Sequence, residues 1–235
     1  KKWINSVEKE ILKYKDKYEN IILVGHSMGG PYNRIFRDLY PNEVKGIVFI
    51  DSSHPEQWNR LAQKELVPKG QAKLFKIGSI LADLGILGIY NKIFSKEPYQ
   101  GDDLPKEAYS RSQSLTYNSG DVFNMFLREN VLTNDVLKRA GETKKLDSLP
   151  VLVFTATEQY KESQKEKYRK AGIDPEKQLQ LWFDMQKELK ELSSQGKQII
   201  MNASHSSIIT KKVNADVINK EILLLSENIE KKNQN

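Results

Sequence analysis

Short, predominantly apolar runs alternate along the chain with longer stretches in which apolar residues recur at intervals of three and four. The apolar runs occur at residues 21–24, 44–50 and 149–155, and a shorter one at 197–201. Runs without regular polar alternation are typical of strands that are buried on both faces of a parallel sheet. The pattern therefore predicts an α/β fold with a mostly parallel sheet. Helices are predicted at residues 32–39, 175–193 and 213–229.

A long segment at residues 57–147 shows helical spacing without strand patterns. We interpret it as a helical cap inserted into an α/β core that is formed by residues 1–56 and 148–235. Residues 80–94 are apolar enough to supply the wall of a pocket beneath such a cap. The chain starts with a predicted amphipathic helix at residues 3–18, which leads into the first strand.

The most informative motif follows the first apolar run. Gly25-His26-Ser27-Met28-Gly29 has the G-x-S-x-G pattern between a predicted strand and a predicted helix, which is the context of a nucleophile elbow. In such a turn the serine hydroxyl is exposed, and the N–H of Met28 can donate to a developing oxyanion. The turn is so sharp that we expect a β-carbon at Gly25 or Gly29 to collide with its neighbours.

A serine nucleophile needs a general base, and the chain has three histidines. His205 is favoured because it lies in a short polar loop after the last predicted strand, where a base can reach the serine. His54 is the competing candidate, or a residue of the substrate-binding pocket. His26 adjoins Ser27 and should point away from it by strand alternation, so we expect it to be structural or to line the pocket.

Two carboxylates are candidates for the residue that orients the base. Asp51 directly follows the run at 44–50, and Glu158 follows the run at 149–155. The chain order of serine, acid and histidine allows both. We favour Asp51 because it adjoins its strand, whereas Glu158 lies farther out in a polar stretch, and Glu158 stays the alternative.

Composition narrows the classes of partner. The net charge of +6 comes from lysines that are spread along the chain and often stand beside glutamates, which is typical of a solvated surface rather than a nucleic-acid site. The absence of cysteine excludes disulfides and thiolate metal sites, and no histidines have metal-ligand spacing, so we expect no metal. No run is apolar enough to span a bilayer, since residues 74–94 contain Lys76, Asp83 and Lys92.

Two segments resemble the α/β-hydrolase superfamily: residues 22–30 (ILVGHSMGG) and residues 40–57, which include the sequence DSSHP. More narrowly, they are similar to a bacterial subgroup of serine hydrolases with Asp-x-x-His-Pro after the strand that follows the nucleophile. A helix with Trp182 before the histidine loop adds to the resemblance. It implies the α/β-hydrolase fold with a cap, hydrolysis of a small-molecule ester or related acyl substrate as in carboxylesterases and lipases, and no cofactor.

The resemblance also implies early strands and a second oxyanion donor, which the first twenty residues do not supply. We therefore expect this chain to be the later part of a longer protein, with the strand at 21–24 at a sheet edge. Some relatives carry an N-terminal membrane anchor, so the protein is expected to be cytoplasmic or anchored through a preceding segment.

The predicted reaction is two-step acyl transfer to water, in which His205 activates Ser27 and Asp51 stabilises the imidazolium. A serine at this position argues against the dehalogenase and epoxide-hydrolase relatives, which use aspartate there. The alternatives are an acyltransferase with the same residues, and a catalytically incomplete fragment or binding module.

Overall fold

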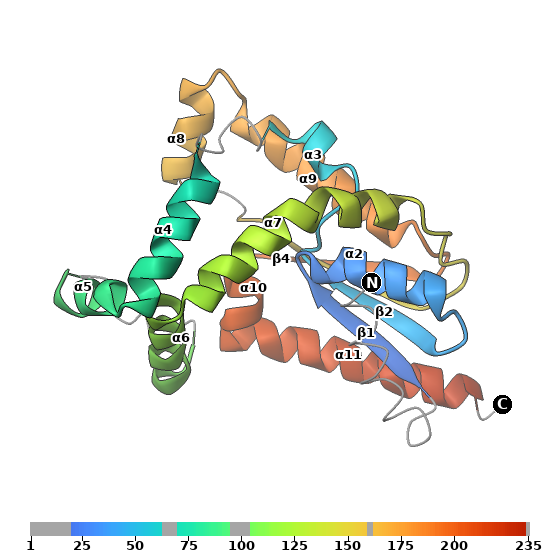
Figure 1. Cartoon of the computed structure of the whole chain (residues 1–235). Coiled ribbons are helices and arrows are strands. Elements are labelled where there is room, and N and C mark those ends of the chain that lie inside the picture. The colour runs from blue at the N-terminus through green and yellow to red at the C-terminus, as the bar shows by residue number, and fades with distance from the viewer. Residues whose placement is uncertain (1–19, 63–69, 95–103, 159–161, 234–235) are drawn as a thin grey trace.

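The computed structural model describes residues 20–62, 70–94, 104–158 and 162–233 (Figure 1). The helix predicted at residues 3–18 lies outside the described residues.

A parallel sheet forms the centre of the structure. Its four strands follow the order β1-β2-β3-β4, so neighbours in the sequence are also neighbours in the sheet. The prediction of an α/β fold with a mostly parallel sheet is confirmed. The strands are β1 (Ile21–His26), β2 (Val44–Ile50), β3 (Val151–Ala156) and β4 (Gly196–Met201).

Helices cover both faces of this sheet. One face packs against α2 (Gly29–Leu39) and α9 (Pro175–Lys190), and the opposite face packs against α11 (Lys212–Asn233) (Figure 1). The start of α9 is well defined, because the side chain of Asp174 accepts hydrogen bonds from the backbone N–H groups of Glu176 and Lys177.

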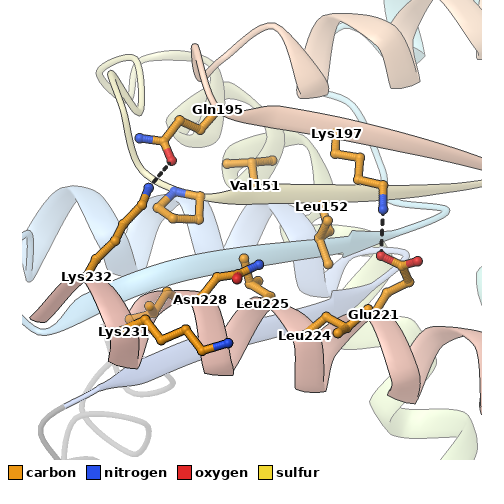
Figure 2. Close-up of a pocket in the computed structure, with 12 residues that line it drawn as sticks. Val151, Leu152, Gln195, Lys197, Glu221, Leu224, Leu225, Asn228, Lys231 and Lys232 are labelled. Carbon is orange, nitrogen blue, oxygen red and sulfur yellow. Dashed lines mark hydrogen bonds and ion pairs between the residues drawn. The ribbon is translucent and has the colours of Figure 1, made fainter. Parts of the chain in front are cut away.

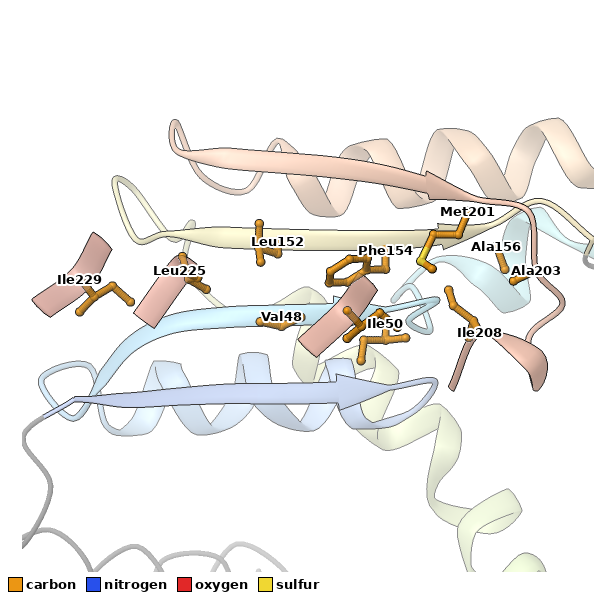
Figure 3. Close-up of a cluster of buried hydrophobic side chains, with 11 residues drawn as sticks. Val48, Ile50, Leu152, Phe154, Ala156, Met201, Ala203, Ile208, Leu225 and Ile229 are labelled. Atoms are coloured by element: carbon orange, nitrogen blue, oxygen red, sulfur yellow. The ribbon is translucent and has the colours of Figure 1, made fainter. Parts of the chain in front are cut away.

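Successive residues of the central strands serve the two faces in turn. Ile47 and Phe49 of β2 pack on the side of α2 and α9, whereas Val48 and Ile50 pack on the side of α11. This alternation is the reason that β2 and β3 read as continuous apolar runs. The cluster beneath α11, which Figure 3 shows, contains Val48, Ile50, Leu152, Phe154, Ala156, Met201, Ala203, Ile208, Ile218, Leu225 and Ile229.

The described residues between β2 and β3 contain helices and no strand. Contacts of α7 with α2 connect this segment to the core: Arg139 Nη2 lies 2.8 Å from Asp38 Oδ2, and Arg34 Nε donates to Thr143 Oγ1 just beyond the end of α7. The helices are α3 (Gln57–Arg60), α4 (Gln71–Asp83), α5 (Ile86–Phe94), α6 (Lys106–Asn118) and α7 (Gly120–Gly141).

Within the described part of the chain, β1 pairs with β2 alone and forms one edge of the sheet, as the sequence predicted. Val24 of this strand is 46% exposed.

The remaining helices are α8 (Glu162–Lys170) and α10 (Ser207–Thr210). Among the described helices, none combines the length and the hydropathy that a membrane span requires.

Candidate active site

Ser27 occupies a sharp turn between β1 and α2. Its φ of 54° lies in the left-handed region, which costs a non-glycine residue on the order of 1–3 kcal/mol. Hydrogen bonds hold this conformation: the Ser27 N–H donates to Ile50 O at 3.2 Å, and its carbonyl accepts from the N–H groups of Gly30 and Ser53. Strand, strained serine and helix follow one another as in a nucleophile elbow.

The glycines around Ser27 differ in what surrounds them. A β-carbon at Gly25 would overlap the backbone of Gly29, in agreement with the prediction. The prediction for Gly29 is wrong, because a β-carbon there would meet no atom within 4 Å. The close approach lies one residue later, where a β-carbon on Gly30 would overlap the side chain of Ser52.

Asp51 follows β2 and is completely buried, with a left-handed φ of 40°. Its Oδ2 lies 2.6 Å from Nδ1 of His205, and its Oδ1 accepts hydrogen bonds from Trp182 Nε1 at 3.0 Å and from the Ala156 N–H at 3.1 Å. Since a carboxylate can only accept, Nδ1 of His205 carries the proton, and Nε2 is the basic nitrogen. Because the Asp51 carboxylate is buried and accepts these hydrogen bonds, its contact with His205 is a strong charge-assisted hydrogen bond.

His205 lies in the loop between β4 and α10, and reciprocal hydrogen bonds between Ser204 and Ser207 hold this loop. The imidazole of His205 lies against that of His26, with ring centroids 4.5 Å apart, and Nε2 of His26 lies 2.8 Å from the carbonyl oxygen of His205. Because His26 directly precedes Ser27, these contacts hold His205 beside the elbow.

Within the described residues, no hydrogen bond joins Ser27 Oγ to His205, and the Met28 N–H donates to no other group. Contacts between nucleophile and base often tighten only when substrate binds. The Met28 N–H at the start of α2 is therefore available to an oxyanion.

His26 supports the histidine loop through its side chain. Burial, and next the proximity of His205, lower the pKa of His26, while its hydrogen bond to the His205 carbonyl opposes this shift. A carbonyl accepts only, so Nε2 of His26 carries the proton and holds the backbone of the candidate base. We find no signal in the sequence for this contact.

The structure does not bring Glu158 into this cluster. The Glu158 side chain is exposed, and its backbone N–H donates to Ala203 O at 2.8 Å. His54 is buried and faces α9 instead: its Nδ1 accepts from the Glu56 N–H, and its Nε2 lies 3.3 Å from Glu188 Oε2. No hydrogen bond in the described part of the chain connects His54 to Ser27, Asp51 or His205.

Sequence reasoning missed the contribution of α9 to the cluster. Trp182 donates to Asp51, and one turn later Gln186 donates to the carbonyl oxygen of Ser52 at 2.7 Å. Both side chains are buried. A glutamine on the apolar face of the predicted helix was the available signal, because a buried amide needs a partner.

A cleft of about 510 Å³ lies at the opposite end of the sheet (Figure 2). It lies between the start of β3, the start of β4 and the later turns of α11, where Lys197 pairs with Glu221 at 2.7 Å. Ser27, Asp51 and His205 follow the carboxyl ends of their strands, where ligands bind in open α/β sheets. The cleft is therefore separate from the candidate active site.

In the described ranges, no group of three or more histidine, aspartate and glutamate side chains is arranged to hold a metal ion.

No protein-family model and no curated protein matches the sequence. Solved structures do match it at low sequence identity. A carboxylesterase from Nitrososphaera gargenis aligns with 97% of this chain and 72% of its own, at 15% identity and a TM-score of 0.53. An epoxide hydrolase from Bacillus megaterium aligns with 95% of this chain and 74% of its own, at 15% identity and a TM-score of 0.59.

A bromoperoxidase from Bacillus anthracis aligns with 95% of this chain and 72% of its own, at 16% identity and a TM-score of 0.50. The chain thus has the α/β-hydrolase fold, as the motifs predicted. Because the printed activities of these proteins differ, the shared fold alone does not choose a reaction.

Replacing Gly30 with alanine should lower the free energy of unfolding by about 1–3 kcal/mol, because the new methyl group would overlap the buried Ser52 side chain. Gly29→Ala is the matched control and should leave stability unchanged or slightly raised. Urea unfolding of both variants tests this, and a larger loss for Gly29→Ala would contradict the packing described here.

His54 should make the folded state sensitive to mild acid. Burial, then Arg34 and Arg60, lower its pKa from 6.5 to about 4, and Arg60 Nη1 also binds the nearby Glu188 at 2.6 Å. Between pH 6.5 and about 4 the unfolded chain binds a proton that the folded chain does not, so stability falls as the pH falls.

Over this range the wild type should lose up to about 3 kcal/mol more than a His54→Gln variant, which does not titrate. Urea unfolding at several pH values measures the difference. Parallel stability curves for the two proteins would show that His54 does not titrate differently on folding.

Proposed function

We propose that the chain is a serine hydrolase that cleaves carboxylic ester bonds in small molecules, with Ser27 as nucleophile, His205 as base and Asp51 as the orienting acid. The observation that carries this proposal is the 2.6 Å contact between Asp51 and His205, held beside a serine with a strained, left-handed backbone. In a Ser-His-Asp mechanism the acid orients the base, and the base activates the serine.

The reaction begins when Nε2 of His205 removes the proton from Ser27 Oγ as the oxygen attacks the ester carbonyl. Asp51 stabilises the imidazolium that forms, through the proton on Nδ1. The protonated Nε2 then donates to the leaving alkoxide, and an acyl-enzyme remains. Water, activated by the same histidine, attacks the acyl-enzyme and releases the carboxylic acid.

The Met28 N–H and the start of α2 support oxyanion stabilisation. This N–H follows the serine directly and donates to no other group in the described residues, so it can donate to the tetrahedral intermediate. The N-terminus of a helix adds positive potential at the same point. A donor of this kind typically contributes about 10²–10³ in turnover.

The side chain at the elbow favours ester cleavage over the epoxide opening in the printed name of one structural neighbour. Attack of Ser27 on an ester yields an ester intermediate, which water can hydrolyse. Attack of the same hydroxyl on an epoxide would yield an ether, which activated water does not cleave. The identity of residue 27 therefore supports an acyl substrate.

We assign the helices of residues 57–147 the role of a cap beside this site. The support is the contact of α7 with α2, since α2 directly follows the elbow. Burial of Tyr32 in α2, and next the proximity of Glu129 in α7, raise the pKa of the Tyr32 hydroxyl.

Ser27→Ala should abolish hydrolysis of short activated esters and covalent labelling by a fluorophosphonate probe, because the alanine has no nucleophilic oxygen. Ser148→Ala, at an exposed serine before β3, serves as the control and should keep both properties. Circular dichroism checks that both variants fold. Labelling or turnover in folded Ser27→Ala at the wild-type level would assign the nucleophile elsewhere.

Asp51→Asn should lower turnover on the order of 10⁴-fold, since an amide cannot hold the histidine in the required tautomer. Glu158→Gln should leave turnover near the wild-type value because that side chain is exposed. Steady-state kinetics on one ester compares the two variants. A large loss in Glu158→Gln with a small one in Asp51→Asn would transfer the role to Glu158.

A further inference from the structure

The α4 helix has two apolar faces, and only one of them is packed. On the inner side Phe75 lies near Phe123 and Phe126 of α7, with ring centroids 6.1 and 6.2 Å apart. Asp83 accepts the N–H of Gly120 on the same side. The outer side carries four further apolar residues, which are 45% to 67% exposed: Leu74, Ile77, Ile80 and Leu84.

The next helix, α5, continues this exposed apolar surface. It follows a turn at Gly85, where φ is 73°, and none of its residues is buried. Its small and polar side faces α6, because a β-carbon on Gly88 would overlap Asn118. The exposed large side chains of α5 are Ile86, Ile89, Tyr90, Ile93 and Phe94.

Figure 1 shows α4, α5 and α6 as an arm that extends away from the sheet and joins the core through α7. The exposed stripe of α4 and α5 therefore belongs to a projecting part of the molecule. Apolar surface of this extent is unusual on a monomeric protein and marks an interaction site.

The charges on these two helices indicate the kind of partner. At about 100° per residue, Lys73 and Lys76 fall on the same outer half of α4 as the exposed leucines and isoleucines, and Lys92 flanks the stripe of α5. The single acidic residue in residues 70–94 is Asp83, which already binds the Gly120 N–H. The outer surface is thus apolar with positive margins.

We propose that the outer surface of α4 and α5 docks in the plane of an anionic lipid bilayer. Lysines beside an apolar stripe are the arrangement of interfacial helices, because their stems reach along the stripe while the ammonium groups meet lipid phosphates. Self-association through the same surface would bring the positive margins of two copies together, and the single acidic residue of residues 70–94, Asp83, already binds the Gly120 N–H, whereas anionic headgroups attract the lysines.

This surface is independent of the proposed hydrolase activity, so its test measures binding alone. The whole 235-residue chain is floated with vesicles of phosphatidylcholine, and with vesicles that also contain phosphatidylglycerol. We expect binding to the anionic vesicles, weaker binding to the neutral ones, and a loss of the difference as salt is raised.

Ile80→Glu and Ile89→Glu should each weaken binding at least about tenfold, because each places a charge in the apolar stripe. Leu223→Glu is the matched control, since Leu223 on α11 is 64% exposed and Ile80 is 60% exposed, and it should bind like the wild type. Lys73→Glu with Lys76→Glu should reduce binding to anionic vesicles by at least about fivefold.

Three results would overturn the proposal. The first is no flotation of the wild type with anionic vesicles. The second is equal loss in Leu223→Glu and Ile80→Glu. The third is a concentration-dependent dimer in sedimentation that Ile80→Glu dissociates while vesicle binding is absent, which would assign the surface to a second copy of the chain.

Discussion

The contact between the buried Asp51 carboxylate and His205 is the interaction on which the candidate active site depends. It joins the loops that follow β2 and β4, 154 residues apart in the sequence. A buried charge is tolerated only when its oxygens are satisfied, and here the end of β3 and the α9 helix supply the donors through Ala156 and Trp182. The Asp51 side chain therefore holds together the loops after β2 and β4, the end of β3 and the α9 helix.

The sequence could predict the strands and the proximity of Asp51 to His205. Strands buried on both faces leave continuous apolar runs, and the runs at 44–50 and 149–155 predicted β2 and β3 for this reason. The shorter runs at 21–24 and 197–201 predicted β1 and β4, which are only partly buried. Because the strands are parallel, the residues that follow them lie together at the carboxyl ends of the strands. The proximity of Asp51 and His205 follows from that rule, and the structure places them 2.6 Å apart.

The features that could not be predicted depend on the angle and depth at which helices meet the sheet. Spacing in the sequence indicates that Trp182 faces the core, but it does not indicate that the indole N–H reaches Asp51. The glycines show the same limit. Gly29 belongs to the G-x-S-x-G motif and Gly30 directly follows it, and only the packed position of Ser52 decides that Gly30 is the one of the two without room for a side chain.

The residues of the candidate site differ in how firmly the fold holds them. Asp51 follows β2, a central strand, and accepts hydrogen bonds from β3 and α9. Ser27 follows β1 and His205 follows β4, which form the two edges of the described sheet. Edge strands with exposed side chains open more readily than central ones. His26, the last residue of β1, compensates for this, because its Nε2 donates a hydrogen bond to the carbonyl oxygen of His205 at 2.8 Å. A residue next to the nucleophile thus ties the strand at one edge of the sheet to the histidine loop that follows the strand at the other edge.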